Sequence, residues 1–205
     1  MNIAYARFGL ILLAASAALS GCISLGKSSD DPPATVYYVL SDLTPLPATA
    51  PSASAPTLRV LDTTTGNFYD TEQLVFSRSA DTRGLYQFAR WTERPSKRFA
   101  ELMRTRLDHQ GVWSVSAGSG HVRSDRLLNT ELIEFYHDAA SQPGQVRLVL
   151  RANLVDIRQR KLLGQRVFEQ QVPLASYDAA AAAQASSLAV SRVLDDLSAW
   201  LATLK

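Results

Sequence analysis

The stretch that decides the fold is residues 146–157, VRLVLRANLVDI, in the second half of a 205-residue chain. Its even positions from 146 to 154 are all apolar, whereas polar residues interrupt the odd positions: Arg147, Arg151 and Asn153. Successive side chains of a β-strand point to opposite faces, so this alternation predicts a half-buried strand with one face on the core.

Two further apolar runs lie on either side of this strand, Leu128 to His137 before it and Leu162 to Val172 after it. The polar triplet Gln159-Arg160-Lys161 supplies the second turn. Runs of this kind joined by short polar turns predict neighbouring antiparallel strands. We therefore expect a meander of three long strands.

Shorter runs rich in β-branched and aromatic residues predict further strands. They are residues 36–40, 58–61, 73–78, 84–90 and 112–116. The turn-forming sequence ADTRG at 80–84 joins two of them as a hairpin. Residues 45–57, PLPATAPSASAPT, predict a long loop, which is either a plain surface loop or a segment that contacts a partner.

Two segments have helical periodicity. The first begins at Pro95, repeats apolar residues at helical spacing and stops at Gly111, so it predicts a helix over 95–110. The second follows Asp178, a residue suited to cap a helix, and is rich in alanine. Its leucines repeat every three or four positions, so it either packs on the sheet or forms a coiled-coil seam. We favour packing because the repeat is short.

These elements occur in the order strands, helix, strands, helix. The expected fold class is therefore α+β, a two-layer sandwich in which a mostly antiparallel sheet carries both helices on one face. A single such domain is expected over residues 36–205.

The amino-terminal segment has the features of a secretory signal. Arg7 precedes the apolar run Phe8 to Leu19, which is shorter than the roughly 20 residues that span a bilayer. This run ends in Leu19-Ser20-Gly21-Cys22, which resembles the lipobox of bacterial lipoproteins, and the other reading is a buried hairpin of small residues. The resemblance implies a signal peptide over 1–21 and acyl chains on Cys22. The small, polar and proline-containing sequence that follows, ISLGKSSDDPPAT, predicts a flexible tether, so the acylated tether spans 22–35.

The residue after the cysteine is Ile23, whereas aspartate there retains a lipoprotein in the inner membrane in the sorting pattern that this segment resembles. The expected location is therefore the periplasmic face of the outer membrane, where the acyl chains on Cys22 would attach the protein. Three acyl chains would hold it permanently, because a single chain binds a membrane only marginally.

Catalytic, metal and cofactor chemistry lack their signatures in this chain. Cys22 is the only cysteine, and the three histidines, His109, His121 and His137, lie on separate predicted elements. The motifs of hydrolases, nucleotide-binding loops and dinucleotide-binding folds do not occur. Glu131 and Glu134 are expected on opposite faces of a strand, where they cannot share a proton. We therefore expect neither an enzyme nor a bound cofactor or metal.

The formal net charge is +2. Nothing in this balance indicates a nucleic-acid surface. One basic group, Arg158, Arg160, Lys161 and Arg166, falls around the last predicted hairpin and is either a solvated turn or a surface for lipid head groups or an acidic partner.

Several short features occur in an order that resembles one family. They are the lipobox, Tyr37-Tyr38-Val39-Leu40, Tyr69-Asp70, Arg90-Trp91 and the alanine-rich final helix. The chain is similar to the ABC-type transport auxiliary lipoproteins, including their paraquat-inducible branch. This resemblance implies an outer-membrane lipoprotein that works with a mammalian-cell-entry (MCE) domain protein and its ABC permease and ATPase in moving lipids between membranes.

On this reading the domain docks a periplasmic assembly to the outer membrane, and it can form a homo-oligomer. Trp91, beside Arg90 and Arg94, either anchors an interface or covers the helix end as a core residue, and Tyr69 has the same two readings. Two other functions stay open. One is an envelope-assembly lipoprotein that partners an outer-membrane barrel, and the other is a periplasmic carrier with its own lipid pocket.

Overall fold

The computed structural model describes residues 33–45, 54–117 and 123–204. The chain divides into two units, Met1–Ala34 and Thr35–Lys205, and the fold is that of the second. The predicted signal peptide, Cys22 and the predicted tether up to residue 32 lie outside the described residues, as do the middle of the predicted loop at 45–57 and His121.

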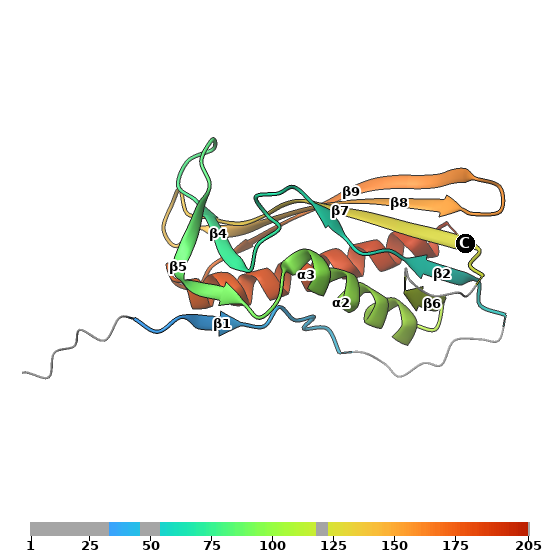
Figure 1. The fold of residues 1–205 in the computed structure, drawn as a ribbon, viewed down its shortest axis with the longest axis horizontal. Helices are drawn as coiled ribbons and strands as arrows, with labels where there is room; N and C mark the ends of the chain where they lie inside the picture. Colours follow the sequence, from blue (N-terminus) through green and yellow to red (C-terminus); the bar gives the residue numbers. More distant parts are fainter. Residues whose placement is uncertain (1–32, 46–53, 118–122, 205) are drawn as a thin grey trace, which may run out of the picture. The chain divides into compact units, whose positions relative to one another are not determined.

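Three long strands form the centre of the domain (Figure 1). They are β7 (Arg126–Asp138), β8 (Gln145–Asp156) and β9 (Lys161–Pro173). Both pairings are antiparallel, so the predicted meander is confirmed. The even positions of β8 from Val146 to Leu154 are completely buried. The alternation in the sequence therefore identified the core face of the sheet.

Six shorter strands complete a nine-stranded sheet. They are β1 (Val36–Tyr38), β2 (Thr57–Val60), β3 (Thr64–Thr65), β4 (Gln73–Ser77), β5 (Gly84–Trp91) and β6 (Ser114–Ala117). β4 and β5 form the predicted antiparallel hairpin. However, β2, β3 and β4 each pair in parallel with β7, and β1 and β6 pair in parallel with β5 and β2. The sheet is therefore mixed, and its antiparallel part is the meander and this hairpin.

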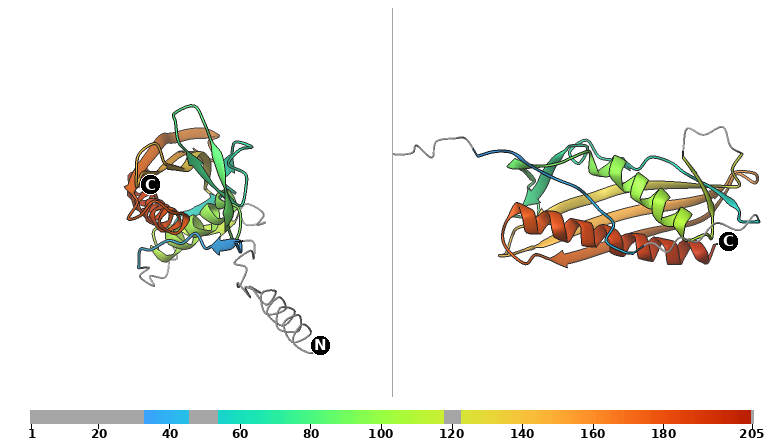
Figure 2. Two further views of the ribbon diagram at one scale, coloured as in Figure 1. Left: turned by 90° about the vertical axis from the view of Figure 1, so that its left-hand side faces the viewer. Right: turned by 90° about the horizontal axis from the view of Figure 1, so that it is seen from below.

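Both helices lie on one face of this sheet, as expected, and the fold is α+β (Figure 2). α2 (Pro95–His109) lies near β2 and β6, and α3 (Ala179–Ala202) lies on β8 and β9. The carboxylate of Asp178 accepts a hydrogen bond of 2.8 Å from the backbone N–H of Ala181, which caps α3 as predicted. The leucines of α3 are buried against the sheet, which favours packing over a coiled-coil seam.

The segment after β1, residues 40–44, runs along both helices, and we call it the strap. The backbone N–H of Leu43 donates to Ser191 Oγ at 2.7 Å, and that of Ser41 donates to Ser187 Oγ at 3.2 Å. The side chain of Leu40 is buried in the core between them. The strap thus attaches the start of the domain to α3.

None of the helices in the described ranges is long and apolar enough to cross a bilayer.

Candidate docking surface

The outer face of the sheet, opposite the helices, carries charged side chains from all three long strands, among them Glu131, Glu134, Arg147, Arg151 and Glu169. Arg151 of β8 donates to Glu131 of β7 at 2.7 Å, and Arg147 of β8 donates to Glu134. Both glutamates therefore lie on the same face, contrary to the sequence prediction. The physical reason is a β-bulge between Leu132 and Glu134, which shifts the alternation by one residue.

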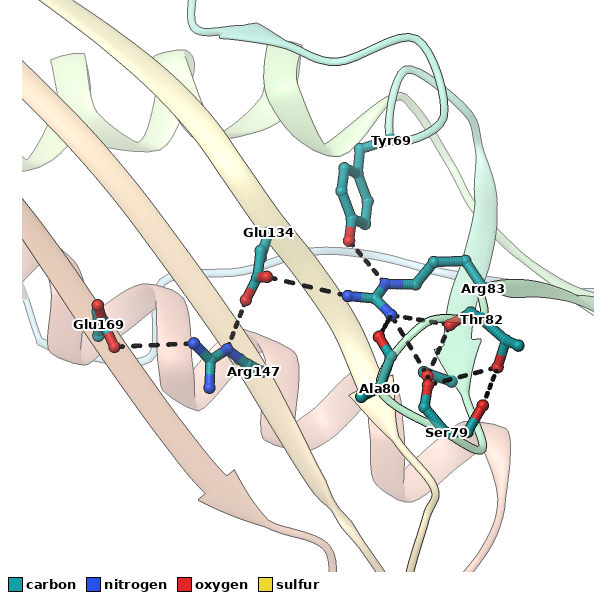
Figure 3. A network of polar contacts seen from close by, with 9 residues as sticks. Tyr69, Ser79, Ala80, Thr82, Arg83, Glu134, Arg147 and Glu169 are labelled. Atoms are coloured by element: carbon teal, nitrogen blue, oxygen red, sulfur yellow. Dashed lines mark hydrogen bonds and ion pairs between the residues drawn. The ribbon is translucent and has the colours of Figure 1, made fainter.

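A chain of polar contacts crosses this face, and we call it the outer-face network: Tyr69, Arg83, Glu134, Arg147 and Glu169 (Figure 3). Arg83 Nε donates to the hydroxyl of Tyr69 at 3.0 Å. Its Nη2 lies 3.9 Å from Glu134, and Arg147 lies between Glu134 and Glu169. The network thus joins the loop before β4, the β4–β5 turn and all three long strands.

Arg83 is held in place from several directions. Its Nη1 donates to the backbone carbonyls of Ala80 at 3.1 Å and Thr82 at 2.8 Å. Its guanidinium carbon also lies 4.0 Å from the ring centroid of Tyr136, which is cation–π geometry. An arginine fixed in this way presents its charge in one orientation, because little of its rotamer freedom remains.

The chemistry of this network suits recognition rather than catalysis. Its members are two arginines, two carboxylates and a phenol, and each carboxylate already pairs with a guanidinium. Partly exposed groups of both signs can set the register and specificity of a protein contact. In the described part of the chain, no group of three His, Cys, Asp or Glu side chains is arranged to hold a metal ion.

The two aromatic residues singled out from the sequence have different environments. Tyr69 is half-buried and belongs to the outer-face network. Trp91 is only 3% exposed, and its ring stacks on Phe135 with centroids 5.9 Å apart. Of the two readings of Trp91, this burial favours the core residue that covers the helix end, because the end of β5 turns the ring into the core.

The described histidines also lie apart, in different elements. His109 ends α2, whereas the ring of His137 on β7 is buried between Tyr86 and Tyr177. Tyr86 Oη lies 2.7 Å from His137 Nδ1, and His137 Nε2 lies 3.1 Å from the carbonyl oxygen of Pro143. Burial lowers the pKa of His137 below its usual value. This histidine is therefore a neutral, fully bonded core residue.

The basic group around the last hairpin differs from the prediction in its members. Arg158, Arg160 and Lys161 do lie at the β8–β9 turn. Arg166 lies farther along β9, where its guanidinium carbon is 5.2 Å from the ring centroid of Phe168. Arg59 and Arg123, from other parts of the chain, lie near this turn instead.

Sequence reasoning missed Arg83 and Arg106, because the side chains that they contact are distant in the sequence. These are Tyr69 and Glu134 for Arg83, and Asp42 and Asp195 for the buried Arg106. Arg83 occupies a turn, and a charged residue in a turn gives no signal of a functional role. The sequence did contain one signal that Arg106 is buried. It lies three residues after Met103 and next to Leu107, on the apolar face of α2.

Comparison with known proteins gives the family. A model described as ABC-type transport auxiliary lipoprotein component matches residues 38–198. A search among curated proteins finds no match.

Solved structures share the fold. A crystal structure of a Xanthomonas campestris protein matches with a TM-score of 0.68 and 21% identity, over 82% of this chain and 95% of that chain. An uncharacterised protein gives 0.66 and 16% identity, over 82% of this chain and 99% of that one. A hypothetical protein of Chlamydia trachomatis gives 0.50 and 12% identity, over 73% and 98%. At such identities the likeness concerns the fold alone, whereas the family match spans most of the chain: this protein belongs to the family of ABC-type transport auxiliary lipoprotein components.

Proposed function

We propose that this protein is a non-catalytic lipoprotein of the outer membrane that docks an MCE-domain assembly, with its ABC permease and ATPase, for lipid transport between membranes. The observation that carries the proposal is the family match over residues 38–198, which includes every described helix and strand except part of β1 and the end of α3. An auxiliary component of an ABC transport system needs a partner surface more than chemistry of its own.

The tight packing beneath β4 and β7 supports docking over carriage of a lipid in this part of the described interior. A void beneath β4 and β7, lined by residues such as Trp91, Phe135 and Ala182, has a volume of about 10 Å³. That volume is at the lower limit for one water molecule. Such a void cannot hold an acyl chain, which favours a domain that acts through its surface.

We assign membrane attachment to acyl chains on Cys22 and outer-membrane sorting to Ile23. The strap supports this role, because it fastens the start of the domain to α3 through two backbone-to-serine hydrogen bonds. Tension on a tether would then be carried into the helical layer. Partner contact is assigned to the outer-face network around Tyr69, and association of several copies is part of the same proposal.

The test is affinity purification of the tagged, full-length protein from mildly solubilised membranes, with bound proteins and lipids identified by mass spectrometry. Recovery of an MCE-domain protein together with a permease or ATPase supports the proposal. Recovery of an outer-membrane barrel without them would instead indicate an envelope-assembly role. Bound lipid without a protein partner would indicate a carrier.

Two variants sharpen this test. Cys22→Ser should release the protein from the outer-membrane fraction of a density gradient. Tyr69→Ser should reduce recovery of the MCE-domain protein, because it removes the phenol that orients Arg83. The matched control is Tyr37→Ser, which changes a 59% exposed tyrosine of β1 outside the network. Equal losses for both tyrosine variants would contradict the assignment of the contact to the network.

A further inference from the structure

A concave basic surface lies where the β8–β9 turn meets the start of β2. Its volume is about 800 Å³. The lining includes three arginines, two hydroxyl side chains and one carboxylate: Arg59, Arg123, Arg158, Thr57, Ser124 and Asp125. We call it the turn pocket. The β8–β9 turn and the start of β2 lie at the opposite end of the long strands from β1 (Figure 1), and no residue of the strap lines the pocket.

The two carboxylates around the turn pocket are already engaged. Asp125 pairs with Arg158 at 2.6 Å and accepts from the backbone N–H of Thr57 at 3.2 Å. Asp156 pairs with Arg126 at 2.6 Å and accepts from the backbone N–H of Gln159 at 2.9 Å. Asp125 therefore neutralises the charge of Arg158, and Asp156 neutralises the charge of Arg126.

The remaining basic side chains leave the region positively charged. Arg123, Arg160 and Lys161 are exposed, and none of them forms an ion pair with another described residue. Arg59 adds a further positive charge from β2. The balance at this end is therefore strongly basic, although the whole chain carries a formal net charge of only +2. Concentrated positive charge in a concavity raises the local concentration of anions.

Backbone hydrogen bonds connect the segments that form the turn pocket. The N–H of Asp125 donates to the carbonyl of Thr57, and the N–H of Ile157 donates to the carbonyl of Asp125, both at 3.1 Å. Three segments that are distant in sequence are thereby held in fixed relation. The pocket therefore rests on a backbone whose position is fixed, which keeps its basic side chains close to one another.

We propose that the turn pocket binds a phosphate group, presented by a phospholipid headgroup or as free phosphate. Guanidinium groups bind phosphate oxygens with paired N–H donors, which is the geometry that Arg123 and Arg158 can supply. The hydroxyl of Thr57 adds a donor. Ile157, 37% exposed at the pocket wall, gives an apolar surface beside the anion, which suits the glycerol region of a lipid. This site goes beyond the docking role and requires no protein partner.

The experiment is titration calorimetry on the full mature chain in a neutral detergent and a phosphate-free buffer of low ionic strength. The probes are dihexanoyl phosphatidylglycerol, dihexanoyl phosphatidylcholine and inorganic phosphate. We expect saturable binding of phosphatidylglycerol, weakened at least about tenfold in the Arg123→Ala/Arg158→Ala double variant. Weaker binding of inorganic phosphate than of the lipid identifies the headgroup as the source, and equal, competitive binding identifies free phosphate.

The matched control is the Arg94→Ala/Lys97→Ala double variant at the start of α2, which removes the same charge from an exposed surface. Equal weakening in both double variants would overturn the site, because the effect would then be one of net charge. Absence of saturable binding by any probe would also overturn it. If the melting temperature of the first variant falls, Arg123→Lys/Arg158→Lys decides, since it keeps the charge and should still weaken binding through loss of the paired donors.

Discussion

The guanidinium of Arg106 on α2 lies against the carboxylate of Asp42 in the strap, with Nε 2.7 Å from Oδ2. The side chains are 2% and 7% exposed. The same guanidinium also pairs with Asp195 on α3. One buried arginine therefore joins the strap to both helices, and the strap cannot leave the helical layer without separating these charges.

Arg106→Ala should lower the free energy of unfolding by about 3–5 kcal/mol, because it leaves the Asp42 carboxylate buried without its partner. Urea unfolding followed by circular dichroism measures this change. Arg104→Ala is the control on the same helix, since Arg104 pairs with the exposed Asp62 and should cost only about 1 kcal/mol. Similar costs for the two variants would contradict the role assigned to Arg106.

Acid should weaken the same contact. Burial by itself raises the pKa of Asp42, but hydrogen bonds from Arg106, Thr44 and Ser191 outweigh it and hold the pKa below its usual value. The stabilisation is therefore present above about pH 4, the value for an unfolded aspartate, and is lost as the pH falls through the lower folded value. Asp42→Asn should be less stable at pH 7 and should lose less stability than the wild type on acidification.

His137 should give a second pH dependence, at higher pH. Burial raises the pKa of Tyr86 to about 12, so its hydroxyl stays protonated and donates to Nδ1 of the neutral ring. Because burial lowers the pKa of His137, the unfolded chain binds more protons below about pH 6.5. The free energy of unfolding should therefore fall as the pH drops through that value. The dependence between pH 7.5 and 5.5 should flatten in His137→Gln, measured by urea unfolding at each pH.

How far the sequence predicted this fold depends on the range of the interactions involved. The alternation around Leu150 and the cap at Asp178 are local patterns, and both the strand and the helix formed as expected. The parallel pairing of β2, β3 and β4 with β7 was not predicted, because it depends on where the chain returns after its loops. A single bulge after Leu132 was enough to place Glu134 on the unexpected face.

The candidate site shows the same division. Tyr69 could be named from its place before a strand, but its partner Arg83 could not, since their contact depends on the folding of the β4–β5 turn over the sheet. Trp91 was named as a candidate contact because it precedes a helix. Its burial follows from Phe135, which is 44 positions away in sequence and receives the indole ring. Long-range packing therefore decided which aromatic residue faces the solvent.

Trp91→Ala should destabilise the domain by about 3–5 kcal/mol, because it empties a large buried site against Phe135. Tyr69→Ser should change stability by about 1 kcal/mol or less, since its ring is only half-buried and it loses one hydrogen bond. Thermal unfolding of the two variants measures both effects. A stable Trp91→Ala protein that fails to bind its partner would restore the interface reading of this residue.

Gly144, in the turn between β7 and β8, should not tolerate a side chain. Its φ angle is +81°, and an added Cβ would collide with the carbonyl oxygen of Asp138 and approach His137 Nε2 to 2.7 Å. Gly144→Ala should therefore cost at least about 2 kcal/mol, from the left-handed backbone and the displaced histidine together. Gly66→Ala is the control, because an added Cβ there meets nothing within 4 Å. Chemical unfolding measures both variants. A lower free energy of unfolding in Gly144→Ala alone, with a weaker pH dependence between pH 5.5 and 7.5, would link this turn to the hydrogen bonds of His137. Equal stability of the two variants would exclude that link.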